Sequence, residues 1–175
     1  FLSASGSKDK YNYFLGASYF NEKGTFMNTD FQKLNIRSNN NYQFSDRVSL
    51  LANIDLNVTN GHSYDYMDMY YTFLTLPWDS AYDADGNPKY IDQTTPGWYS
   101  RDKINPIHSI QNSDYAYRSA SAGLQLGLNI NILKWLTFTS SAGLSYWNSL
   151  ATNAVYPAVA GPLHGIGSLY RQNDF

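Results

Sequence analysis

The chain has 175 residues, a formal net charge of −2 and no cysteine. The small net charge gives no indication of a nucleic-acid partner, and the lack of cysteine excludes a disulfide framework and thiol chemistry. Aromatic residues make up 17% of the chain and charged residues only 15%, a balance that suits strands with one apolar and one polar face. No run of about 18 apolar residues is present, so the sequence predicts no membrane-spanning helix.

The two ends of the sequence lack the features of natural termini. Phe1 is followed by Leu2-Ser3-Ala4-Ser5-Gly6, without the basic start and apolar segment of a signal peptide. Phe175 ends a polar, loop-like stretch. We therefore expect the chain to be a segment of a longer protein.

Five segments alternate apolar and polar residues with the two-residue period of a β-strand, which a helix does not keep. They cover residues 11–21, 31–44, 48–59, 115–132 and 136–147. The residues before an expected turn at 6–10 read as the tail of an earlier strand. The second segment has two flaws, because Ser38 and Asn40 fall on its apolar side.

The predicted strands have about 11 to 18 residues, long against the usual ~5–6 in globular proteins. A tilted strand crosses a membrane in ~9–11 residues, so each of these is long enough to cross. The strongest alternation is in residues 115–132, where leucine, isoleucine and alanine oppose serine, glycine, glutamine and asparagine.

The predicted connections alternate in length along the chain. Short turns are expected at residues 6–10, 45–47 and 133–135, and long connections at 22–30, at 60–114 and from 149 onward. Short turns at one rim and long loops at the other are typical of outer-membrane β-barrels, where the long loops are extracellular.

Aromatic residues support this orientation, because they gather at the two ends of the predicted strands and leave an aliphatic band between them. Near the short turns lie Tyr11, Tyr13, Tyr42, Phe44, Trp135 and Phe138; near the long loops lie Tyr19, Tyr115, Tyr117, Tyr146 and Trp147. Two such belts are what a bilayer favours. A soluble β-sandwich also alternates, but it explains neither the belts nor the long strands.

The predicted fold class is therefore all-β: about five strands plus a stub of a transmembrane, antiparallel, up-and-down β-barrel. A closed barrel needs at least about eight strands. Two open edges in lipid would leave backbone groups without hydrogen bonds, so we expect other chain segments to complete the barrel.

Several stretches resemble the SusC/RagA family of TonB-dependent outer-membrane transporters. They are residues 11–24 (YNYFLGASYFNEKG), 28–39 (NTDFQKLNIRSN), 44–50 (FSDRVSL) and 134–138 (KWLTF). Residues 3–11 fit the family's strand–turn–strand entry, although Ser7 stands where a second glycine is common. In the long loop only residues 82–87 (YDADGN) resemble a family phrase.

The resemblance implies a plugged barrel of about 22 strands in the outer membrane of a Gram-negative bacterium of the Bacteroidetes. It implies active import of glycans, oligosaccharides or peptides, with a SusD-like surface lipoprotein as a lid. TonB would supply energy through an N-terminal plug region that this chain does not include. The alternatives are an outer-membrane adhesin or a structural barrel without transport. An outer-membrane enzyme is not expected, because no Ser/His/Asp cluster supports one.

No catalytic, cofactor or metal site is predicted. His62, His108 and His164 are far apart in the sequence and have no metal-ligand spacing, so they are interpreted as isolated loop histidines. Residues 83–87 faintly resemble a calcium loop but lack its remaining ligands. A turn built by aspartate, glycine and the following proline is favoured there.

The 60–114 loop is the best functional candidate, because a loop this long is usually functional or disordered. Aromatic rings stack on the apolar faces of sugars, and carboxylates accept hydrogen bonds from hydroxyl groups. The residues predicted to contact substrate or lid are Trp78, Tyr82, Tyr90, Asp92, Trp98 and Tyr99. The alternative is that these side chains pack the loop on itself.

Overall fold

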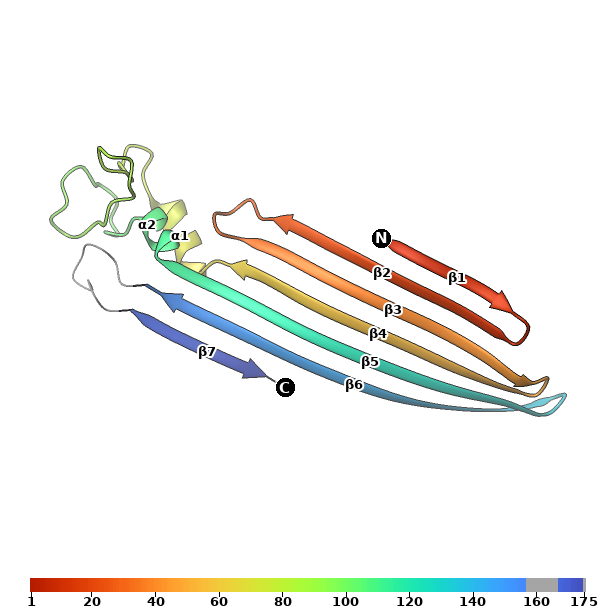
Figure 1. The fold of residues 1–175 in the computed structure, drawn as a ribbon. Helices are drawn as coiled ribbons and strands as arrows, with labels where there is room; N and C mark the ends of the chain where they lie inside the picture. The colour runs from red at the N-terminus through yellow and green to blue at the C-terminus, as the bar shows by residue number, and fades with distance from the viewer. Residues whose placement is uncertain (157–166, 175) are drawn as a thin grey trace.

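The computed structural model describes residues 1–156 and 167–174, which form one antiparallel sheet of seven strands (Figure 1). The strands are β1 (Leu2–Lys8), β2 (Tyr11–Lys23), β3 (Asp30–Ser45), β4 (Val48–Ser63), β5 (Ser113–Leu133), β6 (Leu136–Val155) and β7 (Ser168–Asp174). Each strand pairs with its neighbours in the chain. This all-β meander confirms the predicted fold class, a segment of an antiparallel up-and-down barrel.

The strands follow the predicted segments but extend beyond several of them. The predicted stub is β1, β4 runs on to Ser63, and β6 runs on to Val155. Strand β7 lies in a stretch where no strand was predicted. Its Leu169 and Tyr170 stand side by side, so the segment has no two-residue alternation to detect. Its extended backbone is stabilised by pairing with β6.

The connections differ sharply in length at the two ends of the sheet (Figure 1). Two residues each join β1 to β2, β3 to β4 and β5 to β6: Asp9-Lys10, Asp46-Arg47 and Lys134-Trp135. The other end, called the long-loop rim, has the connection 24–29 and the connection 64–112. The predicted alternation of short and long connections is confirmed in the described residues. His164 lies outside them.

The register gives the sheet one apolar and one polar face. On the apolar face Ile54, Leu124 and Leu144 lie side by side across β4, β5 and β6. On the polar face Asn35 lies opposite Asn57, and the Asn35 amide donates a hydrogen bond to the Asn57 amide oxygen at 2.7 Å. Because successive side chains point to opposite faces, this register keeps the two surfaces separate along most of the strands; Phe14, Phe20 and Leu51 are apolar exceptions on the polar face.

The two polar residues on the apolar face of β3, Ser38 and Asn40, are hydrogen-bonded to each other, and Asn40 also bonds to Tyr11 of β2. The Tyr11 hydroxyl donates to the Asn40 amide oxygen at 2.5 Å, and the Asn40 amide donates to the Ser38 hydroxyl oxygen at 2.9 Å. A polar group away from water is tolerated when it is hydrogen-bonded. The flaws in the sequence alternation are thus a small bonded group in an apolar wall.

Aromatic rings form a continuous row on the apolar face at the short-turn rim. Ring centroids lie 5.7 Å apart for Tyr13 and Tyr11, 6.4 Å for Tyr11 and Tyr42, and 4.8 Å for Tyr42 and Phe44. Such spacings are those of interacting aromatic pairs. This row corresponds to one of the two predicted belts.

The aromatic residues at the long-loop rim are divided between the two faces. Tyr19 and Tyr146 lie on the apolar face, opposite Leu34 and Ala122. Tyr115, Tyr117 and Trp147 lie on the polar face. The second belt on the apolar face is therefore thinner than the sequence indicated, because rim position alone does not specify which face a residue occupies.

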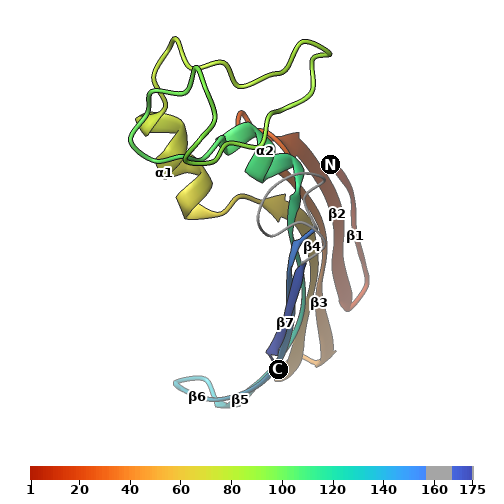
Figure 2. The same cartoon turned by 90° about the vertical axis from the view of Figure 1, so that its left-hand side faces the viewer.

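Two helices lie in the 64–112 connection, α1 (Tyr66–Leu74) and α2 (Pro106–Gln111). Asp65 caps α1 and Asn105 caps α2; each side chain accepts a hydrogen bond from the backbone N–H two residues further on, at 2.8 and 3.1 Å. Figure 2 shows a curved sheet with both helices at one rim, over its concave side. Neither described helix is long and apolar enough to cross a membrane.

Candidate functional site

The 64–112 connection folds around its own small core. The side chains of Ile91, Trp98 and Ile110 are at most 5% exposed. The described strands contain one comparably buried apolar side chain, Ala154, because a single sheet buries neither of its faces. The connection is therefore a structured cap at the long-loop rim.

Asp79 ties two distant segments of this cap together. Its carboxylate accepts hydrogen bonds from the backbone N–H groups of Tyr99 and Ser100, at 2.6 and 3.1 Å, and from the Ser100 hydroxyl. Burial disfavours the charged carboxylate, but these hydrogen bonds outweigh that effect and lower the pKa of Asp79. Residues 78–79 are thereby held beside residues 99–100.

Trp78 and Tyr99 are an exposed aromatic pair beside the Asp79 hydrogen bonds; Tyr66 and Phe73 on α1 are also exposed. Their exposed fractions are 66% and 68%, and the Asp79 carboxylate fixes the backbone beside both of them. Large rings on an ordered backbone offer contact area with little loss of conformational entropy on binding. The pair is therefore suited to contact another molecule.

Two other predicted contact residues point into the cap. Trp98 is 3% exposed, and its indole N–H donates to the backbone oxygen of Asp102 at 3.2 Å. Tyr90 is half-buried and packs edge-on against the ring of His108, with centroids 5.7 Å apart. These two side chains stabilise the cap in this conformation.

The predicted turn at residues 83–87 is confirmed. The Asp83 carboxylate accepts hydrogen bonds from the backbone N–H groups of Asp85 and Asn87, at 2.9 and 2.8 Å. Tyr82 pairs with Pro88 across this turn and is 44% exposed. The carboxylate is engaged by its own backbone, as expected for a turn.

Asp92 belongs to a second turn. Its carboxylate accepts hydrogen bonds from the Thr94 and Thr95 hydroxyls, at 2.8 and 2.9 Å, and these and backbone hydrogen bonds lower its pKa. Of the six predicted residues, only Trp78 and Tyr99 are therefore brought together on the surface. The remaining four pack the cap or stand in separate turns.

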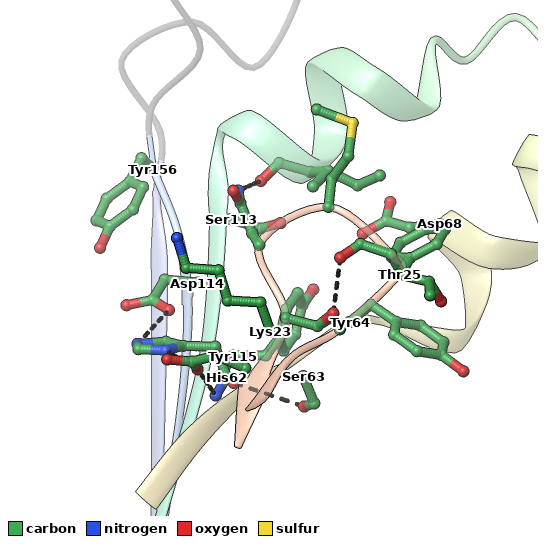
Figure 3. A pocket seen from close by; sticks show the side chains of 17 residues that line it. Lys23, Thr25, His62, Ser63, Tyr64, Asp68, Ser113, Asp114, Tyr115 and Tyr156 are labelled. Carbon is green, nitrogen blue, oxygen red and sulfur yellow. Dashed lines mark hydrogen bonds and ion pairs between the residues drawn. The ribbon is translucent and has the colours of Figure 1, made fainter. Parts of the chain in front are cut away.

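A pocket of about 710 Å³ opens between the cap and the long-loop rim (Figure 3). We call it the rim pocket. The connection 24–29, the ends of β4 and β5, both helices and Tyr156 contribute to its lining. Asn28 helps to close one side, because its amide donates to the backbone oxygen of Ile110 at 3.1 Å.

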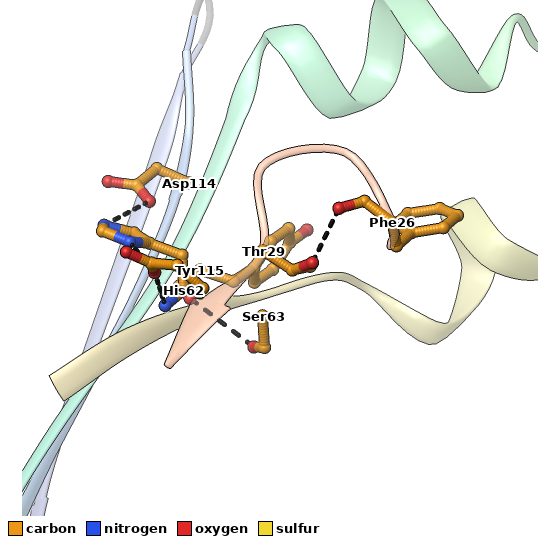
Figure 4. A network of polar contacts seen from close by, with 7 residues as sticks. Phe26, Thr29, His62, Ser63, Asp114 and Tyr115 are labelled. Atoms are coloured by element: carbon orange, nitrogen blue, oxygen red, sulfur yellow. Dashed lines mark hydrogen bonds and ion pairs between the residues drawn. The ribbon is translucent and has the colours of Figure 1, made fainter. Parts of the chain in front are cut away.

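A carboxylate–imidazole–carboxylate network lies at the edge of the rim pocket (Figure 4). The His62 Nδ1 lies 2.7 Å from a carboxylate oxygen of Asp30, and the His62 Nε2 lies 3.7 Å from one of Asp114. The interpretation of His62 as an isolated loop histidine was therefore wrong. The strand alternation, continued to residue 62, would have placed Asp30 opposite it.

No group of three or more side chains with metal-binding geometry occurs in the described parts of the chain. The carboxylate–imidazole–carboxylate network links β3, β4 and β5 through one carboxylate oxygen each of Asp30 and Asp114 and the His62 imidazole. It places two carboxylates at the edge of the pocket.

Asp68 is the buried carboxylate of the rim pocket. It lies on α1, is 4% exposed and helps to line the pocket. Burial raises its pKa, and the side chain of Ser109 opposes this rise by hydrogen bonding. No lysine, arginine or histidine nitrogen forms an ion pair with it in the described residues. Nothing in the local sequence distinguishes Asp68 from the other aspartates of the 60–114 loop, because its burial depends on how the cap folds.

The fold resembles solved structures of a peptide transporter. Structures of the RagAB peptide importer match with TM-scores of 0.68 in the "closed-closed" state and 0.73 in the "open-open" state, at 18% and 21% identity. A structure of the RagAB peptide transporter matches with a TM-score of 0.73 at 21% identity. At these identities the likeness establishes a shared fold.

The three matches cover 97% to 98% of this chain but only 20% of each matched chain. The chain thus spans a fifth of the length of the proteins that it resembles. No protein-family model matches the sequence, and no curated protein shows a significant match.

Proposed function

We propose that this chain is a wall segment of a SusC/RagA-like importer in the outer membrane of a Gram-negative bacterium of the Bacteroidetes. The observation that carries the proposal is the continuous apolar face of a long-stranded meander, bordered by an aromatic row. The likeness to a peptide importer over nearly the whole chain supports it, as does the sequence resemblance of the strands and short turns.

The lipid-facing surface is the apolar face of the sheet. Leu144 is 73% exposed and Leu56 is 42% exposed in the isolated sheet, and such a surface is stable when lipid covers it. The polar face lines the interior of the barrel. There Arg37 lies directly opposite Asp55, which keeps opposite charges near each other in a water-filled or plugged lumen.

The strands are longer than the membrane requires. Strand β5 has 21 residues, or about 70 Å at ~3.3 Å per residue, whereas the apolar band of such barrels is ~25 Å tall. The surplus places the long-loop rim and its cap outside the bilayer. The exposed aromatic pair, Trp78 and Tyr99, then faces the exterior, where a SusD-like lipoprotein lid or an arriving substrate makes contact.

Energy for import comes from TonB through a plug region outside this chain, and the barrel has about 22 strands. The imported solutes are peptides, glycans or oligosaccharides. We favour peptides because the similar solved structures are those of a peptide importer.

The test uses the full-length protein with its lid lipoprotein, in a host strain that lacks its own importer. Uptake of fluorescent oligopeptides and oligosaccharides is measured with and without a protonophore that collapses the proton-motive force. We expect accumulation inside the cell that the protonophore abolishes. Solute that stays on the cell surface under both conditions would instead show an adhesin, and the importer proposal would be wrong.

A further inference from the structure

The rim pocket has an excess of negative charge. Its lining includes three carboxylates, those of Asp30, Asp68 and Asp114, and the side chain of one permanent cation among the described lining residues, Lys23. Asp30 and Asp114 share His62. Figure 3 shows Asp68 on the side of the pocket opposite to His62 and Asp114. Asp68 is therefore the carboxylate that this network does not engage.

The buried Asp68 carboxylate has no cationic partner among the described residues. A carboxylate removed from water is unfavourable unless it is paired with a cation, and one hydroxyl partner supplies only part of that stabilisation. Asp68 is 4% exposed and borders open space within the pocket. A cation that enters this space would complete the pairing without any rearrangement of α1.

Aromatic rings form the adjoining wall of the pocket. The rings of Phe26 and Tyr64 pack with centroids 4.7 Å apart, and Tyr115 lines the pocket while its hydroxyl donates to the Asp65 carboxylate at 3.1 Å. Aromatic faces attract organic cations. A carboxylate beside such rings selects an ammonium or guanidinium group over a small, strongly hydrated metal ion.

We propose that the rim pocket binds a monovalent organic cation, a primary ammonium or a guanidinium group, between Asp68 and the rings of Tyr64 and Tyr115. The group belongs to a solute arriving from outside or to the amine of a lipid headgroup at the rim. This inference rests on the proposed function in one respect, namely that the long-loop rim faces the outside of the cell. Binding is measured without transport, so the two proposals fail independently.

Lys23 makes the proposal testable in two directions. Its side chain is exposed, and its charge acts on Asp30, which lies opposite it where β2 and β3 pair at the pocket, so it repels an incoming cation. Lys23→Gln removes this repulsion and should tighten binding. Asp68→Asn removes the attraction at nearly constant shape and should weaken it. Asp85→Asn, an exposed carboxylate outside the pocket, is the matched control.

The assay is isothermal titration of the detergent-solubilised full-length protein with N-acetyl-arginine amide. The neutral, nearly isosteric N-acetyl-citrulline amide is the reference ligand. We expect binding of the arginine compound alone. Asp68→Asn should reduce its affinity about 10- to 100-fold, as expected for a lost hydrogen bond to a charged group. Lys23→Gln should raise the affinity several-fold, and Asp85→Asn should leave it unchanged.

A second set of titrations separates the two sources of the cation. The same protein is placed in nanodiscs with and without phosphatidylethanolamine. Competition by the lipid assigns the pocket to a headgroup amine, and undiminished binding assigns it to a solute. Equal binding of the citrulline compound overturns the proposal. So does unchanged affinity in Lys23→Gln, a gain-of-affinity test that misfolding cannot imitate.

Discussion

Replacement by alanine should strongly destabilise the cap at one of its two tryptophans and have little effect at the other. Trp98 is 3% exposed and Trp78 is 66% exposed. Trp98→Ala opens a cavity in the core around Ile91 and Ile110 and removes the indole hydrogen bond to Asp102. Trp78→Ala removes a ring that mostly faces solvent, and it leaves the Asp79 hydrogen bonds in place.

The two substitutions should raise the population of the opened cap by amounts that differ by more than tenfold. Truncating a buried tryptophan to alanine costs about 3–5 kcal/mol, which raises the population of the opened cap by about 100-fold or more. An exposed substitution away from special features stays within about 0.5 kcal/mol, or about twofold. The loss in Trp98→Ala should fall mainly on the cap, because the strands pair with one another through their own backbones.

Limited proteolysis of the full-length protein in detergent measures this difference. When reclosing is fast, the cleavage rate follows the population of the open form. We expect rapid cleavage within residues 64–112 in Trp98→Ala and near wild-type resistance in Trp78→Ala. Unchanged heat-modifiable gel mobility would show that the barrel is intact in both. Equal cleavage of the two variants would refute the description of the cap as a folded unit with its own core.

Three further predictions concern the sheet and the cap. Gly61→Ala should reduce the folded fraction on heat-modifiable gels, because a Cβ there would lie 2.4 Å from a backbone oxygen of β3. Gly127→Ala, with its nearest neighbour at 3.5 Å, should not; equal loss in both would contradict the packing at Gly61. The pKa of Asp79 is lower in the folded cap than in the unfolded chain, so its charged form stabilises the cap fully at pH values above the unfolded-state pKa. This contribution is lost as the pH falls through the folded-state pKa. Protease resistance should therefore decline below about pH 4, and Asp79→Asn should flatten this decline; an identical pH profile in the variant would disprove the role of Asp79. Leu144→Arg, on the apolar face, should destabilise the full-length barrel in vesicles by about 2–4 kcal/mol at the bilayer midplane, whereas Ser145→Arg, on the polar face, should have little effect. A larger loss of stability in Ser145→Arg would show that the polar face, and not the apolar face, contacts lipid.

The sheet was largely predictable from the sequence, because alternation is a local property that each strand carries by itself. Strand β7 was missed for the same reason: Leu169 and Tyr170 are adjacent, and only pairing with β6 orders the segment. The two helices differ in how far the sequence indicates them. Helix α1 is apolar nearly all round and has no helical pattern of apolar and polar residues. Helix α2 is short, and its one local signal is the Asn105-Pro106 start, which favours a helix N-terminus.

The candidate site was less predictable than the sheet. Trp78 and Trp98 have the same chemistry, and nothing in their local sequence indicates that one is buried and the other exposed. Asp68 acquires its role only when α1 packs against the rim. His62 was different, because its pairing with Asp30 follows from extending the alternation of β3 and β4 by a few residues.

The bonded group formed by Tyr11, Asn40 and Ser38 has a consequence for how the strands find their alignment. A shift of one residue between β2 and β3 would turn every side chain to the wrong face, but a shift of two would keep apolar residues together. A shift of two that brings Asn40 opposite Leu15 would, however, carry its amide oxygen away from the Tyr11 hydroxyl that donates to it, while its amide N–H groups keep their acceptors on Ser38 and Ala52. A buried acceptor left without a donor costs about 1–3 kcal/mol. The polar interruption in the apolar wall therefore disfavours a misalignment that hydrophobicity alone would tolerate.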